Sequence, residues 1–436
     1  MRSVESLRVD LPTAAGARFR IEDDPDRALV ASVYSLPSAW IDAGEARAML
    51  AAVRAADPRR EILVLADEAM ASGLAPLVGP GGAGGPRLLV ARGGPYSPWP
   101  RDPFSFARAP GGAVRVIVRP NLQRGREADA ELGPELVRTL PHDLDRAWGG
   151  VRWARATVPF HNGQVLLTRE AAWVSMHTFE PRVLELLGAP RVPVERFADA
   201  AGVDAYLAAI RRAGDELAAL YDRPVRFVHP LPLAASEPVV SRGAMLRRLL
   251  GGAGYDLDSL VTVLPAAGER RVTALVADLA LGERLLAGLP DGEWASFAAA
   301  YGLAPQGLAA GLAVASGSDR GHALASYLDL VADHLRNEGL EVARLPLLVV
   351  PTSLRRAGGE LPDEYFFVTW SNVVVERRAD GLRAEGFSGL IPTGDRLARE
   401  AFAQAGARLD LLPPLLGSVE RNGGYRCASN HVRAAE

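Results

Sequence analysis

The sequence contains no lysine, and all 49 of its basic residues are arginine. A lysine is needed by enzymes that hold pyridoxal phosphate as a Schiff base, and by phosphate-binding loops of the Walker type. The absence of lysine therefore excludes both of these classes of site.

Cysteine and net charge are also scarce. The single cysteine, Cys427, excludes an intramolecular disulfide. The formal net charge of -3 on 436 residues gives no basic field of the kind that attracts nucleic acid or an anionic membrane. Met1–Asp10 lacks the apolar core of a signal peptide, and no apolar run is long enough to span a bilayer. We therefore expect a cytoplasmic protein with a small-molecule substrate and no nucleic-acid or membrane partner, and leave homo-oligomerisation open.

Segments typical of strands alternate with segments typical of helices along the chain, which predicts an α/β fold. In three places an amphipathic helix ends at Gly or Pro and leads into a strand: Ile41–Asp67, Gly321–Pro346 and Gly394–Pro413. This repetition favours a modular architecture, although an ordinary α/β sheet alternates in the same way. We expect one domain over residues 1–436, with a helical insertion at about 278–338.

A glycine-rich motif of the form G-x-G-x-x-G occurs at Gly79, Gly81 and Gly84. In a dinucleotide site this motif follows a strand and begins a helix. Here it follows an expected helix and precedes the expected strand Arg87–Val90. The motif therefore does not indicate a nucleotide, and we expect no cofactor.

Residue types that bind metals occur in two pairs, Cys427 with His431 and Asp256 with Asp258. Nothing in the sequence joins the two pairs, and neither H-E-x-x-H nor a paired C-x-x-C is present. We expect no metal site.

The only thiol lies in the C-terminal segment R-N-G-G-Y-R-C-A-S-N-H, residues 421–431. Gly423 and Gly424 allow a tight turn and the close approach of a substrate. Arg426, next to Cys427, would favour the thiolate, which is the nucleophilic form. A buried structural cysteine is the alternative, and the local residues leave both open.

A second segment, W-P-R-D-P-F at residues 99–104, places a carboxylate among aromatic residues. A carboxylate accepts two N–H groups of a guanidinium while an indole covers its flat face, so Asp102 and Trp99 suit such a ligand. The alternative is a salt bridge of Arg101 or Asp102 that fixes the loop.

The two motifs, in this order, resemble those of the guanidino-group-modifying (pentein) superfamily. W-P-R-D-P-F is similar to the W-x-R-D of agmatine deiminases and the T-R-D-P-F of arginine deiminases, and N-G-G-Y-R-C-A-S-N is similar to the G-G-x-R-C-x-S that holds the nucleophile. Three further segments resemble a strand, a helix and a strand of the superfamily: Trp370–Val375, Thr393–Gln404 and Ala407–Leu412. The resemblance implies a pseudo-fivefold α/β propeller of ββαβ units around a central site.

The resemblance also implies chemistry. The Cys427 thiolate would attack a guanidinium carbon and form a covalent amidino-thioether, with Asp102 as one carboxylate clamp on the guanidinium. Hydrolysis would make the chain a deiminase or dihydrolase, and transfer to an amine would make it an amidinotransferase. The substrate-binding residues expected from the matching segments are Asp102, Trp99, Arg101, Arg426, Asn162 and Gly424.

Two positions depart from the superfamily pattern. His161 stands where a glutamate is expected, and Asp256 stands where a histidine is expected, whereas Asp258 matches the superfamily aspartate. One interpretation is an exchange, in which His161 transfers protons while Asp256 and Asp258, with Asp102, hold the cation. The other is loss of the reaction, which leaves a protein that binds a cationic ligand without turnover. The exchange requires His161 within hydrogen-bond reach of Cys427, directly or through one water.

Overall fold

The structure is a computed structural model of the chain, and it describes most of the residues. The described residues are 5–9, 20–21, 23–77, 85–91, 96–120, 126–231, 238–252, 256–266, 271–303, 317–354 and 365–435. Gly79, Gly81 and Gly84 lie outside them, as does part of the expected helical insertion.

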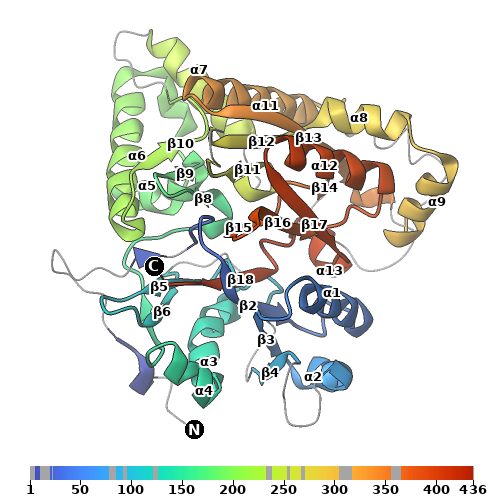
Figure 1. The fold of residues 1–436 in the computed structure, drawn as a ribbon. Coiled ribbons are helices and arrows are strands. Elements are labelled where there is room, and N and C mark those ends of the chain that lie inside the picture. Colours follow the sequence, from blue (N-terminus) through green and yellow to red (C-terminus); the bar gives the residue numbers. More distant parts are fainter. Residues whose placement is uncertain are drawn as a thin grey trace.

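The described strands form five sheets, and each sheet contains the same ββαβ unit. Two antiparallel strands are followed by one or more helices and then by a third strand, which pairs in parallel with the second. The prediction of an α/β fold is confirmed, and the sheets are mixed and not closed. The helices lie around the outside of the strands (Figure 1).

Two of the sheets contain the N-terminal part of the chain. The first has the order β18 (Ser429–Arg433), β2 (Leu29–Leu36), β3 (Glu61–Ala66) and β4 (Arg87–Val90), with helices α1 (Ala43–Ala56) and α2 (Glu68–Leu74). The second has the order β1 (Arg20–Ile21), β5 (Phe104–Arg108), β6 (Val114–Val118) and β7 (Arg152–Arg155), with α3 (Leu132–Thr139) and α4 (His142–Ala147). The first unit is therefore completed by a strand from the C-terminal end of the chain.

The middle of the chain forms two more sheets. One has the order β10 (Val225–Phe227), β9 (Ala172–Val174) and β8 (Val165–Leu167), with α5 (Glu180–Leu187), α6 (Ala200–Tyr221) and α7 (Val239–Gly252). The other has the order β11 (Val261–Leu264), β12 (Thr273–Asp278), β13 (Glu341–Pro351) and β14 (Tyr365–Thr369). Between β12 and β13, the described part of the expected insertion is helical: α8 (Leu279–Ala287), α9 (Asp291–Ala300) and α11 (Asp319–Asn337).

The fifth sheet has the order β15 (Val374–Arg378), β16 (Gly381–Phe387) and β17 (Ala407–Leu412), with α12 (Pro392–Gln404) between β16 and β17 and the short α13 (Leu416–Val419) after it. The segment Trp370–Val375 is not all strand as expected, because β15 begins only at Val374. The residues before it form a turn, and that turn contributes to the site described below.

The three repeated segments of the sequence correspond to the helix and the parallel strand of three different units. They are α1 with β3, α11 with β13, and α12 with β17. In α1, Asp42 accepts hydrogen bonds from the backbone N–H groups of Gly44 and Glu45, which satisfies the first turn. The buried side chains of α1 are four residues at helical spacing, Ala46, Met49, Leu50 and Val53. Burial of each large apolar side chain stabilises the fold by about 1.5–3 kcal/mol.

No helix in the described ranges has both the length and the apolar composition to cross a membrane.

A buried ion cluster joins the fifth sheet to the first. Arg60, which is fully buried just before β3, donates hydrogen bonds to Glu385 Oε1 (2.8 Å) and Glu376 Oε1 (3.1 Å). Tyr425, two residues before the thiol, donates to Glu385 Oε2 (3.1 Å). The cluster therefore connects the packing of two sheets to the segment that holds Cys427.

Replacement of Arg60 by Met should destabilise the protein by about 3–5 kcal/mol, because the buried Glu376 and Glu385 would lose the fully buried cation that they share. Urea unfolding followed by circular dichroism measures the change. Arg396→Met is the matched control, since Arg396 forms a solvent-exposed pair with Glu400 on α12 and its loss should cost no more than about 0.5 kcal/mol. Equal effects of the two substitutions would contradict this account of the Arg60 cluster.

Candidate active site

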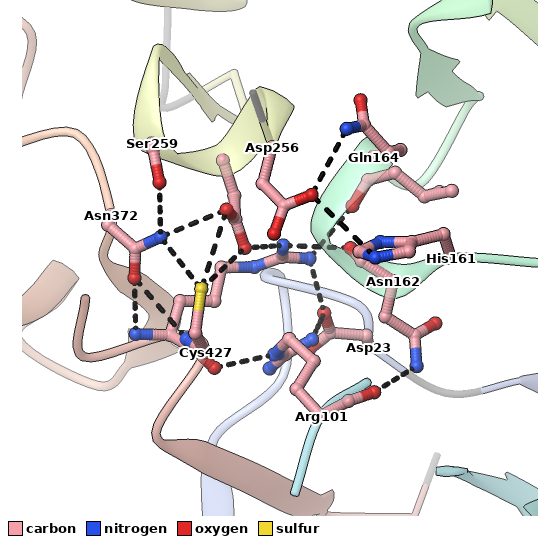
Figure 2. A network of polar contacts seen from close by, with 12 residues as sticks. Asp23, Arg101, His161, Asn162, Gln164, Asp256, Ser259, Asn372 and Cys427 are labelled. Carbon is pink, nitrogen blue, oxygen red and sulfur yellow. Dashed lines mark hydrogen bonds and ion pairs between the residues drawn. The ribbon is translucent and has the colours of Figure 1, made fainter. Parts of the chain in front are cut away.

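Five turns, one from each ββαβ unit, supply the candidate site. Each turn ends where the first strand of its unit begins, and its polar residues lie two or three positions before that strand. These positions are Arg101 and Asp102 before β5, Asn162 and Gly163 before β8, Asp258 and Ser259 before β11, Ser371 and Asn372 before β15, and Arg426 and Cys427 before β18. Residues far apart in the sequence therefore meet at one place in the fold (Figure 2).

The guanidinium of Arg426 connects several of these turns. It donates to Asp258 Oδ2 (2.8 Å), to Asp23 Oδ2 (3.1 Å) and to the backbone oxygens of Asn162 (3.1 Å) and Val165 (2.8 Å). Arg426 was expected to stabilise the thiolate; its guanidinium forms ion pairs with two carboxylates, and its charge also interacts with Cys427. Its main effect is to fix the geometry of the site.

Asn372 holds the cysteine turn from the other side. Its amide nitrogen donates to Asp258 Oδ1 (2.9 Å) and lies 3.2 Å from Cys427 Sγ. Its amide oxygen accepts the backbone N–H groups of Arg426 (2.7 Å) and Cys427 (3.3 Å). A Cβ atom at Gly424 would lie 2.5 Å from the Asn372 side chain, so the close approach that glycine permits there is to Asn372 and not to a substrate as expected.

Cys427 lies beside two carboxylates. Its sulfur is 3.7 and 3.8 Å from the two carboxylate oxygens of Asp258. The ligand atoms of Asp256, Asp258 and Cys427 all lie within 4.8 Å of one another, and so do those of Asp102, His161 and Asp256. The expectation that nothing joins Cys427 to the pair Asp256 and Asp258 is therefore wrong. Both groups offer donor types that bind divalent cations.

The carboxylates near the thiol have unusual proton affinities. Burial, with the nearby charge of Asp102, raises the pKa of Asp256 to about 7. Burial also raises the pKa of Asp258 to about 6; Asp256 adds to the rise and Arg426 opposes it. Burial and these same carboxylates raise the pKa of the Cys427 thiol well above its ordinary value. A cation placed among these groups would therefore be stabilised, and it would favour the thiolate.

In the exchange interpretation, His161 lies within hydrogen-bond reach of Cys427, directly or through one water. No hydrogen bond joins it to Cys427 among the described residues, and its Nε2 lies 3.7 Å from Asp256 Oδ1. Figure 2 shows Asp256 between His161 and Cys427. Burial, with the charge of Arg119, lowers the pKa of His161 to about 4, so the imidazole is neutral at physiological pH. Gly163 permits this arrangement, because a Cβ atom there would lie 2.8 Å from Asp256 Cγ.

Asp102, the expected guanidinium clamp, binds the guanidinium of an arginine of the chain itself, Arg126. Arg126 donates to Asp102 Oδ2 (2.7 Å), and its guanidinium lies over the Trp99 ring, 4.7 Å from the centroid. Asp102 Oδ1 is buried and has no hydrogen-bond partner. Trp99 and Asp102 therefore both contact the guanidinium of Arg126, and Asp102 is not a free clamp for a substrate.

Arg101 and Asn162 fix the turns in place. Arg101 donates to Asp23 Oδ2 (2.7 Å) and to the backbone oxygen of Arg426 (2.9 Å), which fits the loop-fixing alternative. Asn162 donates to the backbone oxygens of Arg101 (2.6 Å) and Phe104 (3.2 Å). These contacts hold the turns of the site in position relative to one another.

Asn372, Asp23 and Arg126 are among the residues of the site that escaped prediction from the sequence. Asn372 could have been found, because it is the polar residue two positions before a first strand, like Asp102 and Cys427. Asp23 binds Arg101, Arg426 and Arg433; burial opposes them, but these three guanidinium groups hold its pKa well below the ordinary value. No local pattern marks Asp23 or Arg126, since their partners are distant in the sequence or in a different turn.

His431 was considered as a partner of Cys427. Its ring nitrogens lie 3.0 Å from Ser32 Oγ and 2.9 Å from Ser429 Oγ, within the β18–β2 pair. His431 therefore belongs to the packing of this sheet.

The fold is similar to that of solved structures of an agmatine deiminase and an assigned arginine deiminase, which confirms the predicted resemblance at the level of the fold. Agmatine deiminase of C. jejuni superposes with a TM-score of 0.55 at 10% identity, over 97% of this chain and 99% of that one. A protein assigned as an arginine deiminase, from Porphyromonas gingivalis, gives a TM-score of 0.51 at 11% identity, over 94% of this chain and 97% of that one. No protein-family model matches the sequence, and a search of curated proteins finds no match.

The thiol should react slowly with iodoacetamide near neutral pH, because its pKa is raised. At about pH 8.5 Asp256 is ionised, so Asp256→Asn should speed alkylation several-fold by removing a negative charge beside the sulfur. At about pH 5.5 Asp256 carries its proton, and the two proteins should react at similar rates. Intact-protein mass spectrometry follows the single thiol. A matched substitution of the exposed Asp329 should change neither rate, and an unchanged rate in Asp256→Asn at both pH values would contradict the assignment.

Proposed function

We propose that this chain is a cysteine-dependent enzyme that acts on the guanidino or amidino group of a small molecule, by deiminase-like hydrolysis or by amidino transfer. One observation carries the proposal: the only thiol lies within 4.8 Å of two carboxyl groups that favour a cation, the buried Asp258 and the partly buried Asp256. The fold shared with agmatine deiminase supports the reaction class. In this proposal the chain is a single domain, and its five sheets are the units of a pseudo-fivefold arrangement around the site.

The substrate guanidinium binds between Asp256 and Asp258, next to Cys427. The positive charge offsets both carboxylates and lowers the cost of ionising the thiol. The sulfur then attacks the guanidinium carbon and forms a C–S bond. One C–N bond of the resulting tetrahedral carbon breaks, and the C–S bond is kept. The product of this step is an amidino-thioether on Cys427 and a free amine or ammonia.

Asp256 moves the proton in this scheme. It accepts the thiol proton, directly or through one water, and donates it to the departing nitrogen. The carboxylate so formed then takes a proton from the water, or the amine, that attacks the thioether carbon and releases Cys427. A carboxyl group with a pKa of about 7 can both accept and donate a proton near neutral pH. His161 is neutral and weakly basic, so in this scheme it acts only as a hydrogen-bonding group.

Chloroacetamidine tests the cation-and-thiol site. It should alkylate Cys427 much faster than iodoacetamide does, since the amidinium is held by the carboxylates. A guanidino compound should block the reaction, and Asp258→Asn should slow it because one of the carboxylates nearest the sulfur loses its charge. Equal slow rates with both reagents would favour the alternative, a protein of this fold that binds a cationic ligand without turnover.

If Asp256 accepts the thiol proton, kcat/KM should rise as pH increases through about 7, because the free enzyme needs the ionised carboxylate. In Asp256→Asn the rise should disappear, and kcat should fall by about 100- to 10,000-fold, as expected for loss of general acid–base catalysis. The assay measures ureido product or released amine. His161→Gln with a profile like that of Asp256→Asn would instead assign the proton transfer to His161.

A further inference from the structure

Arg119 is a buried cation for which the described part of the chain shows no ion pair. It follows β6, and its backbone N–H donates to the Pro103 oxygen (2.8 Å), which fixes it beside the turn that carries Asp102. Only 6% of the residue is exposed. Its Nε is buried without a hydrogen-bond partner, and its side chain forms no ion pair within the described residues. Burial of an unpaired charge costs free energy, so such a residue is expected where a bound ligand supplies the opposite charge.

The charges that face Arg119 come from several turns. Asp102 and Asp256 attract it, and Arg126 repels it. Asp102 is already paired with Arg126, and Asp256 accepts a hydrogen bond from Gln164 (3.1 Å). The charge of Arg119 is therefore not matched by a close contact with either carboxylate.

The site consequently has two regions of opposite charge, which are called its poles below. Asp256 and Asp258 lie beside the thiol, whereas Arg119 lies near Asp102 and His161. A ligand with only a guanidinium would use the first pole and leave Arg119 unpaired. A ligand with a second cationic group, as in agmatine, would be repelled by Arg119 if that group came near it.

We propose that Arg119 binds an anionic group of the substrate, and that the substrate class is a guanidino acid with a guanidinium at one end and a carboxylate at the other. This inference rests on the proposed function, since it places the guanidinium at the thiol. A guanidinium donates two parallel N–H groups to a carboxylate, so Arg119 suits the acid better than a neutral polar group.

The test compares 4-guanidinobutyrate with n-butylguanidine, which lacks the carboxylate. The wild-type protein should prefer the acid in kcat/KM. Arg119→Gln should lower kcat/KM for the acid by about 10- to 100-fold, the usual effect of losing a charge-assisted hydrogen bond, and should change the value for butylguanidine by less than about twofold. Arg115→Gln is the control, because Arg115 lies on β6, the strand that Arg119 follows, and it donates to the backbone oxygens of Val114 and Gly150. Equal use of the two compounds by the wild type, or an equal loss for both in Arg119→Gln, would overturn the proposal.

Calorimetry on Cys427→Ala protein separates this inference from the proposed reaction, since binding needs no turnover. If the acid binds and Arg119→Gln weakens that binding, the role of Arg119 is supported. This conclusion holds even if the wild-type protein releases no product, because the missing product would count only against the proposed reaction. Equal binding of both compounds would overturn the role of Arg119 and leave the reaction standing. Binding of neither would overturn both.

Discussion

The buried guanidinium of Arg426 is the interaction on which the geometry of the site depends. A charge in the interior is tolerated only when its hydrogen bonds are satisfied, and Arg426 satisfies them with two carboxylates and two backbone oxygens from separate turns. The planar fork of arginine makes several such contacts at once, which a lysine ammonium does with less geometric control. Because Cys427 is the next residue, the same contacts set the position of the thiol.

The repetition of one structural unit explains how these contacts arise. In each unit a turn leads into the first strand of an antiparallel pair, and the helix that follows returns the chain to a parallel strand. The turn residues lie at equivalent positions, and their backbone groups are left without partners by the sheet. Asn162 and Asn372 bind such groups, as Arg426 does, so the turns are held by side chains of one another. The candidate site is thus a product of the same contacts that join the units.

The sequence predicted the parts of this arrangement that are local. Helix α12 and strand β17 follow the expected ranges within one residue, and the amphipathic helix expected within Ile41–Asp67 is α1. The motifs around Asp102 and Cys427 are contiguous, so they could be recognised without the fold. Arg126 could not be assigned to Asp102, because that pairing depends on how the chain returns after β6. The turn before β15 was expected to be strand because Trp370–Val375 resembles a strand of the superfamily, whereas β15 begins at Val374 and Asn372 contacts Cys427 from the turn.

The two altered positions show why residue identity alone did not define the chemistry. An imidazole in place of a carboxylate would ordinarily add a group that titrates near neutral pH, but burial and Arg119 make His161 a weak base. A carboxylate in place of an imidazole would ordinarily be ionised, but burial and Asp102 give Asp256 a pKa of about 7. The environment therefore transfers the titrating behaviour from the histidine to the aspartate. Since Asp256 also lies within 4.8 Å of Asp258 and Cys427, the proposed mechanism assigns the proton exchange with the thiol to this aspartate and not to His161.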